Sequence, residues 1–109
     1  MPSYVIIADH SPDICPSANA RTRARAKEGL GPEALPKALA DHGVSFVLEP
    51  MHLDPGHTTL AIVTAANIES VVRFANDTGL VQWNTVNVYP TTPIGELMAN
   101  VDDTPAIFD

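Results

Sequence analysis

The chain of 109 residues has a single cysteine, and this cysteine lies in a polar loop rather than in an apolar stripe. Cys15 stands between Pro12 and Pro16, five positions after His10, and a segment rich in helix-forming residues begins near Asn19. A thiol just before a helix N-terminus has a lowered pKa because it feels the positive end of the helix dipole. We expect Cys15 to act as nucleophile, redox group or soft metal ligand, with His10 as its acid–base partner and Asn19 orienting it or donating to a ligand. The alternative is that Cys15 only packs as a small apolar residue.

A second group of ligand-type residues surrounds the turn at residues 54–56, whose proline and glycine favour a tight reversal of the chain. His52 and His57 flank this turn. Two histidines and a carboxylate can bind zinc, copper, nickel or iron. The candidate metal ligands are therefore His52 and His57, joined by Cys15 and His10. The alternative is that both turn histidines are simply solvated at the tip of a hairpin.

The elements that must position these residues follow from the apolar patterns and the turn signals. Short β-branched runs predict strands over 3–9, 44–53, 57–64 and 85–89. Helical spacing and capping residues predict helices over 19–28, 33–42, 68–78 and 94–101, the first two forming one interrupted connection. The chain is then a single α+β domain over 1–109, with the ferredoxin-like order β-α-β-β-α-β and a C-terminal extension.

This order predicts where the two groups of ligand-type residues lie. The first and third strands of a ferredoxin-like sheet are antiparallel neighbours, so the loop after the first strand and the tip of the hairpin reach the same edge. We therefore expect His10, Cys15, His52 and His57 to share one pocket. His42, in the last turn of a helix, is expected to be structural, and Trp83 is expected to be a core or interface aromatic that can also wall a pocket.

The element order, the small size and the C-terminal extension resemble the dimeric α/β-barrel superfamily. The segment over 83–90, WNTVNVYP, looks like the last strand and exit loop of small members of that superfamily. Its members include muconolactone isomerase-like proteins, small monooxygenases, chlorite dismutase-like proteins and stress-responsive barrel proteins. The resemblance implies a homodimer or higher homo-oligomer that packs through its open sheet faces, with the tail over 101–109 reaching onto the partner subunit. It assigns no catalytic residue.

Composition limits the possible partners and the compartment. The chain has 6 basic against 13 acidic residues and a net charge of -7, which argues against a nucleic-acid partner. The sequence has no apolar run near the roughly 18 residues of a membrane span and no secretory signal pattern at its N-terminus. One cysteine cannot form an internal disulfide, which fits a reducing cytoplasm.

These observations favour a small cytoplasmic enzyme that acts on a small organic or sulfur-containing molecule through a Cys/His pocket. One alternative is a metal-binding or metal-responsive protein with histidine and cysteine ligands. Another is a non-catalytic oligomeric interaction module, in which the open sheet only builds an assembly.

Overall fold

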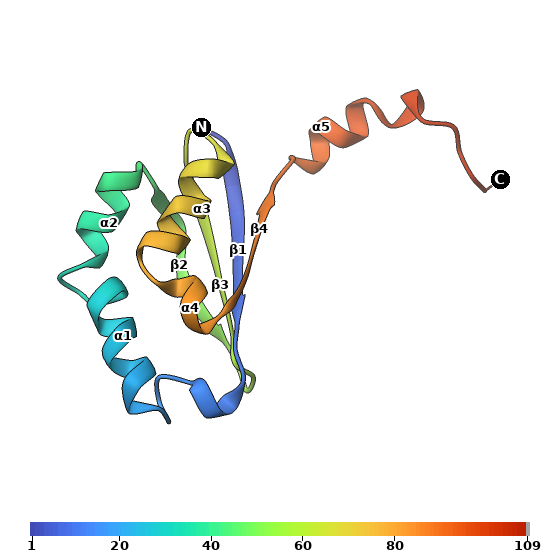
Figure 1. Cartoon of the computed structure of the whole chain (residues 1–109). Coiled ribbons are helices and arrows are strands. Elements are labelled where there is room, and N and C mark those ends of the chain that lie inside the picture. Colours follow the sequence, from blue (N-terminus) through green and yellow to red (C-terminus); the bar gives the residue numbers. More distant parts are fainter. Residues whose placement is uncertain (109) are drawn as a thin grey trace.

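A four-stranded antiparallel sheet carries the helices α1 to α4 on one of its faces in the computed structural model, which describes residues 1–108 (Figure 1). The strands are β1 (Ser3–Asp9), β2 (Ser45–Leu53), β3 (Thr58–Thr64) and β4 (Thr85–Pro90), in the spatial order β2-β3-β1-β4. The helices are α1 (Ala20–Leu30), α2 (Leu35–His42), α3 (Ile68–Asp77), α4 (Leu80–Trp83) and α5 (Ile94–Ala99), with 3-10 turns at Pro12–Ile14 and Val101–Asp103. The predicted α+β class with an antiparallel sheet is confirmed.

Local sequence signals explain where the helices begin and end. The side-chain oxygen of Asn19 accepts from the backbone N–H of Thr22 at 3.0 Å and caps α1, and Asn67 caps α3 in the same way. Gly43 (φ 64°) and Gly79 (φ 81°) follow α2 and α3 in the left-handed conformation that glycine adopts without strain. The short helix α4 was not predicted, because four residues are too few for a helical period to show in the sequence.

Alternate residues of β1 build the core. Tyr4, Ile6 and Ala8 are buried and face the helices, where Val71 and Phe74 of α3 pack against the sheet. The residues between them face the opposite side of the sheet. Because side chains alternate in this way, a residue just beyond the end of β1 also points toward the helices if it continues the series of Tyr4, Ile6 and Ala8.

His42 joins α2 to α3, as expected for a structural residue. Its Nδ1 lies 2.8 Å from the carbonyl oxygen of Ala38, and its Nε2 lies 2.8 Å from a carboxylate oxygen of Asp77 in α3. The Ala38 carbonyl and the Asp77 carboxylate raise the pKa of His42, in that order of importance.

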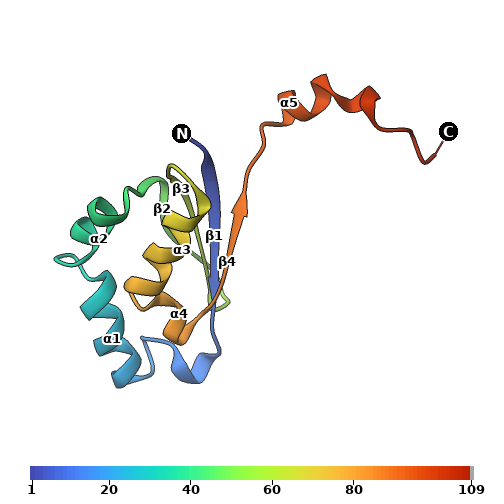
Figure 2. The same ribbon diagram turned by 45° about the horizontal axis from the view of Figure 1, so that its top comes forward.

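The chain after β4 leaves the body of the molecule. Figures 1 and 2 show α5 and the residues after it projecting away from the sheet as an arm. Of the tail predicted over 101–109, residue 109 lies outside the described residues. Across residues 1–108, none of the helices combines the length and the apolar character needed to cross a bilayer.

Candidate metal and thiolate site

The structure brings together three of the predicted site residues from two distant loops. One ring nitrogen of His10, one of His57 and the Sγ atom of Cys15 lie within 4.8 Å of one another. The two imidazole rings meet edge to face, with their centroids 5.4 Å apart. This is a set of two imidazoles and one thiol with the composition of a transition-metal site.

The pairing of β1 with β3 places the two histidines. The register pairs Ala8 with Thr59 and Asp9 with Thr58, and the ladder continues one step further when the N–H of His10 donates to the carbonyl oxygen of His57 at 3.2 Å. Cross-strand partners project to the same side of a sheet. Because Ala8 faces the helices, both histidines extend that face beyond the ends of the strands.

Cys15 reaches the histidines from the loop between β1 and α1. Its carbonyl oxygen accepts from the backbone N–H groups of Ala18 (2.9 Å) and Asn19 (2.8 Å), which folds the loop into a tight turn. This turn places the Ser17 hydroxyl 3.0 Å from Sγ of Cys15. The sulfur therefore has a polar neighbour that can donate a hydrogen bond to the thiolate.

The pKa of the Cys15 thiol is lowered to about 6. The Ser17 hydroxyl is the main cause, followed by the Ser17 backbone and the His10 ring, with a smaller contribution from His57. These causes are hydrogen bonds in the turn around Cys15, whereas the sequence suggested the dipole of the helix that begins at Ala20. At neutral pH Cys15 is mainly the thiolate, which is both the nucleophilic and the metal-binding form.

The loop is also fastened to the first turns of α1. The NH₂ group of Asn19 donates to the carbonyl oxygen of Asp13 at 3.3 Å, while its side-chain oxygen caps the helix. The guanidinium of Arg23 donates to the carbonyl oxygens of Pro16 (2.8 Å) and Ser17 (2.9 Å). The Asn19 side chain thus joins the loop that carries Cys15 to the first turn of α1.

Asn84 fixes the orientation and the tautomer of His10. Its NH₂ group donates to the carbonyl oxygen of Leu80 at 3.1 Å, so its Oδ1 is the acceptor 2.8 Å from Nδ1 of His10. Nδ1 of His10 must then carry a proton. In the neutral ring Nε2 has the lone pair that a metal needs, and only the doubly protonated ring can donate to the Cys15 thiolate from Nε2. A histidine held by a hydrogen bond to its other nitrogen is the usual arrangement for a metal ligand.

Three buried polar atoms around the site are unsatisfied. Nε2 of His10, Nδ1 of His57 and Nε1 of Trp83 have no hydrogen-bond partner within residues 1–108. A buried polar atom without a partner costs about 1–3 kcal/mol, so native structures rarely leave several of them in one place. Since the Trp83 ring also packs on His10, with ring centroids 5.3 Å apart, the three atoms belong to one region.

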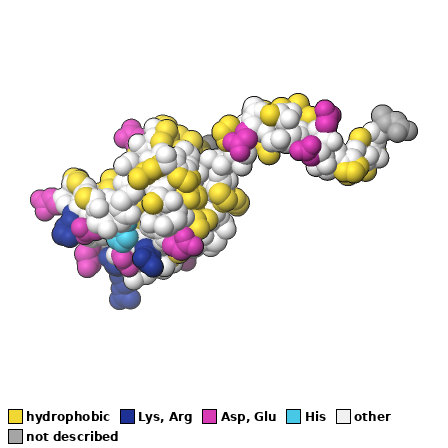
Figure 3. Space-filling model, turned by 90° about the horizontal axis from the view of Figure 1, so that it is seen from above, with side chains coloured by type: hydrophobic (Ala, Val, Ile, Leu, Met, Phe, Trp, Pro, Cys, Tyr) yellow, Lys and Arg dark blue, Asp and Glu magenta, His cyan; other side chains and the backbone are white. Residues whose placement is uncertain are grey.

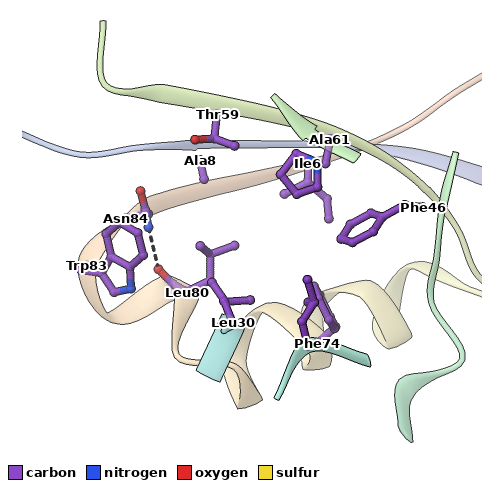
Figure 4. A pocket seen from close by; sticks show the side chains of 12 residues that line it. Ile6, Ala8, Leu30, Phe46, Thr59, Ala61, Phe74, Leu80, Trp83 and Asn84 are labelled. Atoms are coloured by element: carbon purple, nitrogen blue, oxygen red, sulfur yellow. Dashed lines mark hydrogen bonds between the residues drawn. The ribbon is translucent and has the colours of Figure 1, made fainter. Parts of the chain in front are cut away.

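A cavity of about 240 Å³ adjoins this region on the helical side of the sheet (Figure 4). Trp83 and Asn84, the two residues that contact His10, form one end of it, and Ala8 and Thr59 line the sheet beside that end. The rest of the wall is made by apolar side chains of the strands and helices. The cavity and the group of three ligand residues therefore share a wall.

His52 does not join the group, although the sequence grouped it with the other three residues. Its side chain is 52% exposed, and its Nδ1 lies 2.6 Å from a carboxylate oxygen of Asp54 within the hairpin. His57, in contrast, follows the turn and stands opposite His10. The predicted shared pocket holds for His10, Cys15 and His57 only.

Two contributors to the site were missed from the sequence. Ser17 lies two residues after Cys15, and its hydroxyl group, so close in sequence to a loop cysteine, could have indicated a hydrogen bond to the sulfur. Asn84 follows α4 and reaches His10 from the far end of the chain, which no local pattern in the sequence indicates.

No protein-family model, curated protein or solved structure matches this chain.

The Cys15 thiol should titrate well below the usual range for a cysteine. In metal-free protein we expect the rate of alkylation by iodoacetamide, followed by mass spectrometry, to rise with pH around a midpoint of about 6, because only the thiolate reacts. Ser17→Ala should move the midpoint toward the ordinary value of about 8.5, whereas Ser45→Ala, at an exposed position of β2, should leave it unchanged. A wild-type midpoint near the ordinary value would contradict the hydrogen-bonded thiolate.

Proposed function

We propose that the chain binds one transition-metal ion through His10, Cys15 and His57, and that the metal acts on a small organic molecule. The observation that carries this proposal is the meeting of three ligand atoms within 4.8 Å, two of them from histidines that each leave a buried ring nitrogen unpartnered within the described chain. A metal ion would satisfy the lone pairs that the protein leaves unused.

The chemistry of the three ligands narrows the choice of metal. Imidazole suits zinc, copper, iron and nickel, and thiolate favours zinc and copper. Zinc and copper are therefore the preferred ions among the four candidates. Bonds of about 2.0–2.3 Å put ligand atoms roughly 3.3–3.8 Å apart, so small rotations of the Cys15 and His57 side chains would bring the three atoms into coordination distance.

Three protein ligands also leave a coordination position open, which is typical of catalytic rather than structural zinc sites. Asn84 supports the same assignment, because it holds His10 in the tautomer whose Nε2 can bind a metal.

Thiolate chemistry without a metal is a second candidate function, and the lowered pKa of Cys15 favours it. A Cys15 thiolate beside Nε2 of His10 has the two partners that nucleophilic catalysis needs, a nucleophile and an acid–base group. A reactive thiol of this kind is kept reduced in the cytoplasm, which is the location that we propose.

Metal binding should depend on the side chains of His10, Cys15 and His57 and not on His52, a third histidine nearby. By isothermal titration calorimetry with Zn²⁺, wild-type protein is expected to bind one ion per chain, and Cys15→Ser, His10→Ala and His57→Ala should each abolish that binding. Asn84→Leu, which removes the hydrogen bonds to His10 and to the Leu80 carbonyl but no ligand atom, should weaken it roughly 10- to 100-fold.

His52→Ala is the matched control, since His52 is exposed and lies outside the group. Unchanged affinity in this variant is expected. Absence of Zn²⁺ and Cu²⁺ binding by the wild type would overturn the metal proposal. If the alkylation midpoint were still about 6, the metal-free thiolate function would remain.

We also propose that the sheet is ferredoxin-like and that two copies pack sheet to sheet as a dimeric α/β barrel. The strand order β2-β3-β1-β4, with the two helical connections on one face, supports this fold. The opposite face is apolar, and the register places on it the side chains of Val5, Ile7, Leu48, Met51, Leu53, Leu60, Ile62 and Tyr89. An apolar face of this extent is typical of an association surface.

The arm supports the same assembly. Its large apolar side chains are more than half exposed, at Ile94, Leu97, Met98, Val101, Ile107 and Phe108. Figure 3 shows hydrophobic side chains along the arm, while Lys and Arg gather at the end of the molecule away from it. A second copy would cover both the sheet face and the arm.

Dimerisation should fail when a charge is placed on the open sheet face. Met51→Glu introduces a carboxylate at a position that is 47% exposed in the single chain, and we expect it to convert a dimer to a monomer in size-exclusion chromatography with light scattering. Val72→Glu, at a similarly exposed position on α3, should leave the dimer intact. A monomeric wild type at micromolar concentration would contradict the proposed assembly.

A further inference from the structure

The cavity on the helical side of the sheet lies over a stretch of small side chains (Figure 4). The register of β1 and β3 pairs Ile6 with Ala61 and Ala8 with Thr59, and all four residues line the cavity. Three of the four are small, so they leave about 240 Å³ unfilled between the sheet and the side chains of the helices, such as that of Phe74. The cavity is therefore a consequence of which residues the sequence places on this face of the sheet.

The lining offers very few polar groups to a bound molecule. None of the residues that line the cavity carries a charge. Asn84 uses its amide oxygen for His10 and its NH₂ group for a backbone carbonyl, and the indole nitrogen of Trp83 has almost no accessible surface. Among the lining side chains the hydroxyl of Thr59 is the remaining polar group. A charged molecule would lose its hydration there without gaining an ionic partner.

An unfilled apolar cavity of this size is unusual, because protein interiors are close-packed and voids larger than a water molecule are few. The side chains around a void lose contacts, which lowers stability. Water is a poor occupant, since a buried water needs two to four polar partners. An apolar molecule would restore the lost contacts. The composition of the wall thus favours an uncharged, apolar occupant.

The volume and the rings in the wall narrow the kind of molecule. An apolar cavity of about 150 Å³ lined by leucine, isoleucine and phenylalanine binds benzene in another protein. The cavity of about 240 Å³ is larger, and it has room for a benzene ring with a short alkyl substituent. Phe46, Phe74 and Trp83 line it, and aromatic pairs pack favourably edge to face or offset.

The cavity also has a way in from solvent. Pro50 lines it and is exposed, and it belongs to β2, which is an edge strand of the sheet. The cavity therefore reaches the surface beside β2.

We propose that this cavity is a binding site for one uncharged, apolar aromatic molecule about the size of a short-chain alkylbenzene. The inference does not depend on the proposed metal site, because His10, Cys15 and His57 do not line the cavity.

Three probes with the same number of non-hydrogen atoms test the proposal: isopropylbenzene, benzoate and 2-phenylethylammonium. By isothermal titration calorimetry with metal-free wild-type protein, isopropylbenzene should bind at one site per chain. It should bind roughly tenfold or more tightly than either ion, because the lining cannot compensate for lost hydration of a charge. In methyl NMR spectra, isopropylbenzene should shift the signals of Ile6, Ala8 and Ala61. No binding of isopropylbenzene, or equal binding of either ion, would overturn the proposal.

A variant that fills the cavity shows whether the probe binds inside it. Ala61→Leu adds three carbon atoms at the floor of the cavity and should abolish binding of isopropylbenzene. Because the added atoms enter empty space, the Tm of this variant should stay the same or rise. If Ala61→Leu does not fold, Ala8→Leu makes the same test from β1. Unchanged binding in a folded filling variant would contradict the proposal, because the probe would then bind elsewhere.

Ala65→Leu is the matched control. Ala65 is also fully buried, but it belongs to the packed core and does not line the cavity. A leucine at this position should lower the Tm through overpacking while isopropylbenzene still binds. A similar fall in Tm for Ala61→Leu and Ala65→Leu would contradict an open cavity beside Ala61.

Discussion

The hydrogen bond from the N–H of His10 to the carbonyl oxygen of His57 holds the site together. It extends the antiparallel ladder of β1 and β3 by one residue pair beyond the strands, and it makes the two histidines cross-strand neighbours. Because side chains alternate along a strand, a shift of one residue in this register would turn one of the two rings to the open face of the sheet. The buried residues of β1 fix the register, since Tyr4, Ile6 and Ala8 must all face the helices.

The polar atoms around His10 and His57 lie next to largely apolar side chains. Ser17 stabilises the Cys15 thiolate, and Asn84 directs the lone pair of His10. Three buried atoms nevertheless have no partner within residues 1–108. Natural proteins tolerate such a cost mainly where function requires it. The metal ion that we propose accounts for the two histidine nitrogens.

Much of this arrangement could be predicted from the sequence, and the rest depended on information that no local pattern carries. The strand over 3–9, the capping residues Asn19 and Asn67, and the meeting of the Cys15 loop with the hairpin all followed from residue types and their order. His52 was grouped wrongly, because the sequence does not show that its ring would pair with Asp54 at the exposed edge of the hairpin.

The hydrogen bond between Asn84 and His10 could not be predicted from the sequence, for a different reason. It depends on α4, a helix of four residues, which turns the chain so that an amide reaches across to β1. The hydrogen bonds that lower the pKa of the thiol were likewise a matter of conformation, because the turn after Cys15 brings Ser17 close to the sulfur.

X-ray absorption spectroscopy of the zinc-loaded protein tests the central claim most directly, because it reports which atoms bind the metal. We predict one sulfur ligand at about 2.3 Å and two imidazole nitrogens at about 2.0–2.1 Å. A shell of oxygen atoms alone, or a spectrum without sulfur in the wild type, would contradict a metal centre built from His10, Cys15 and His57.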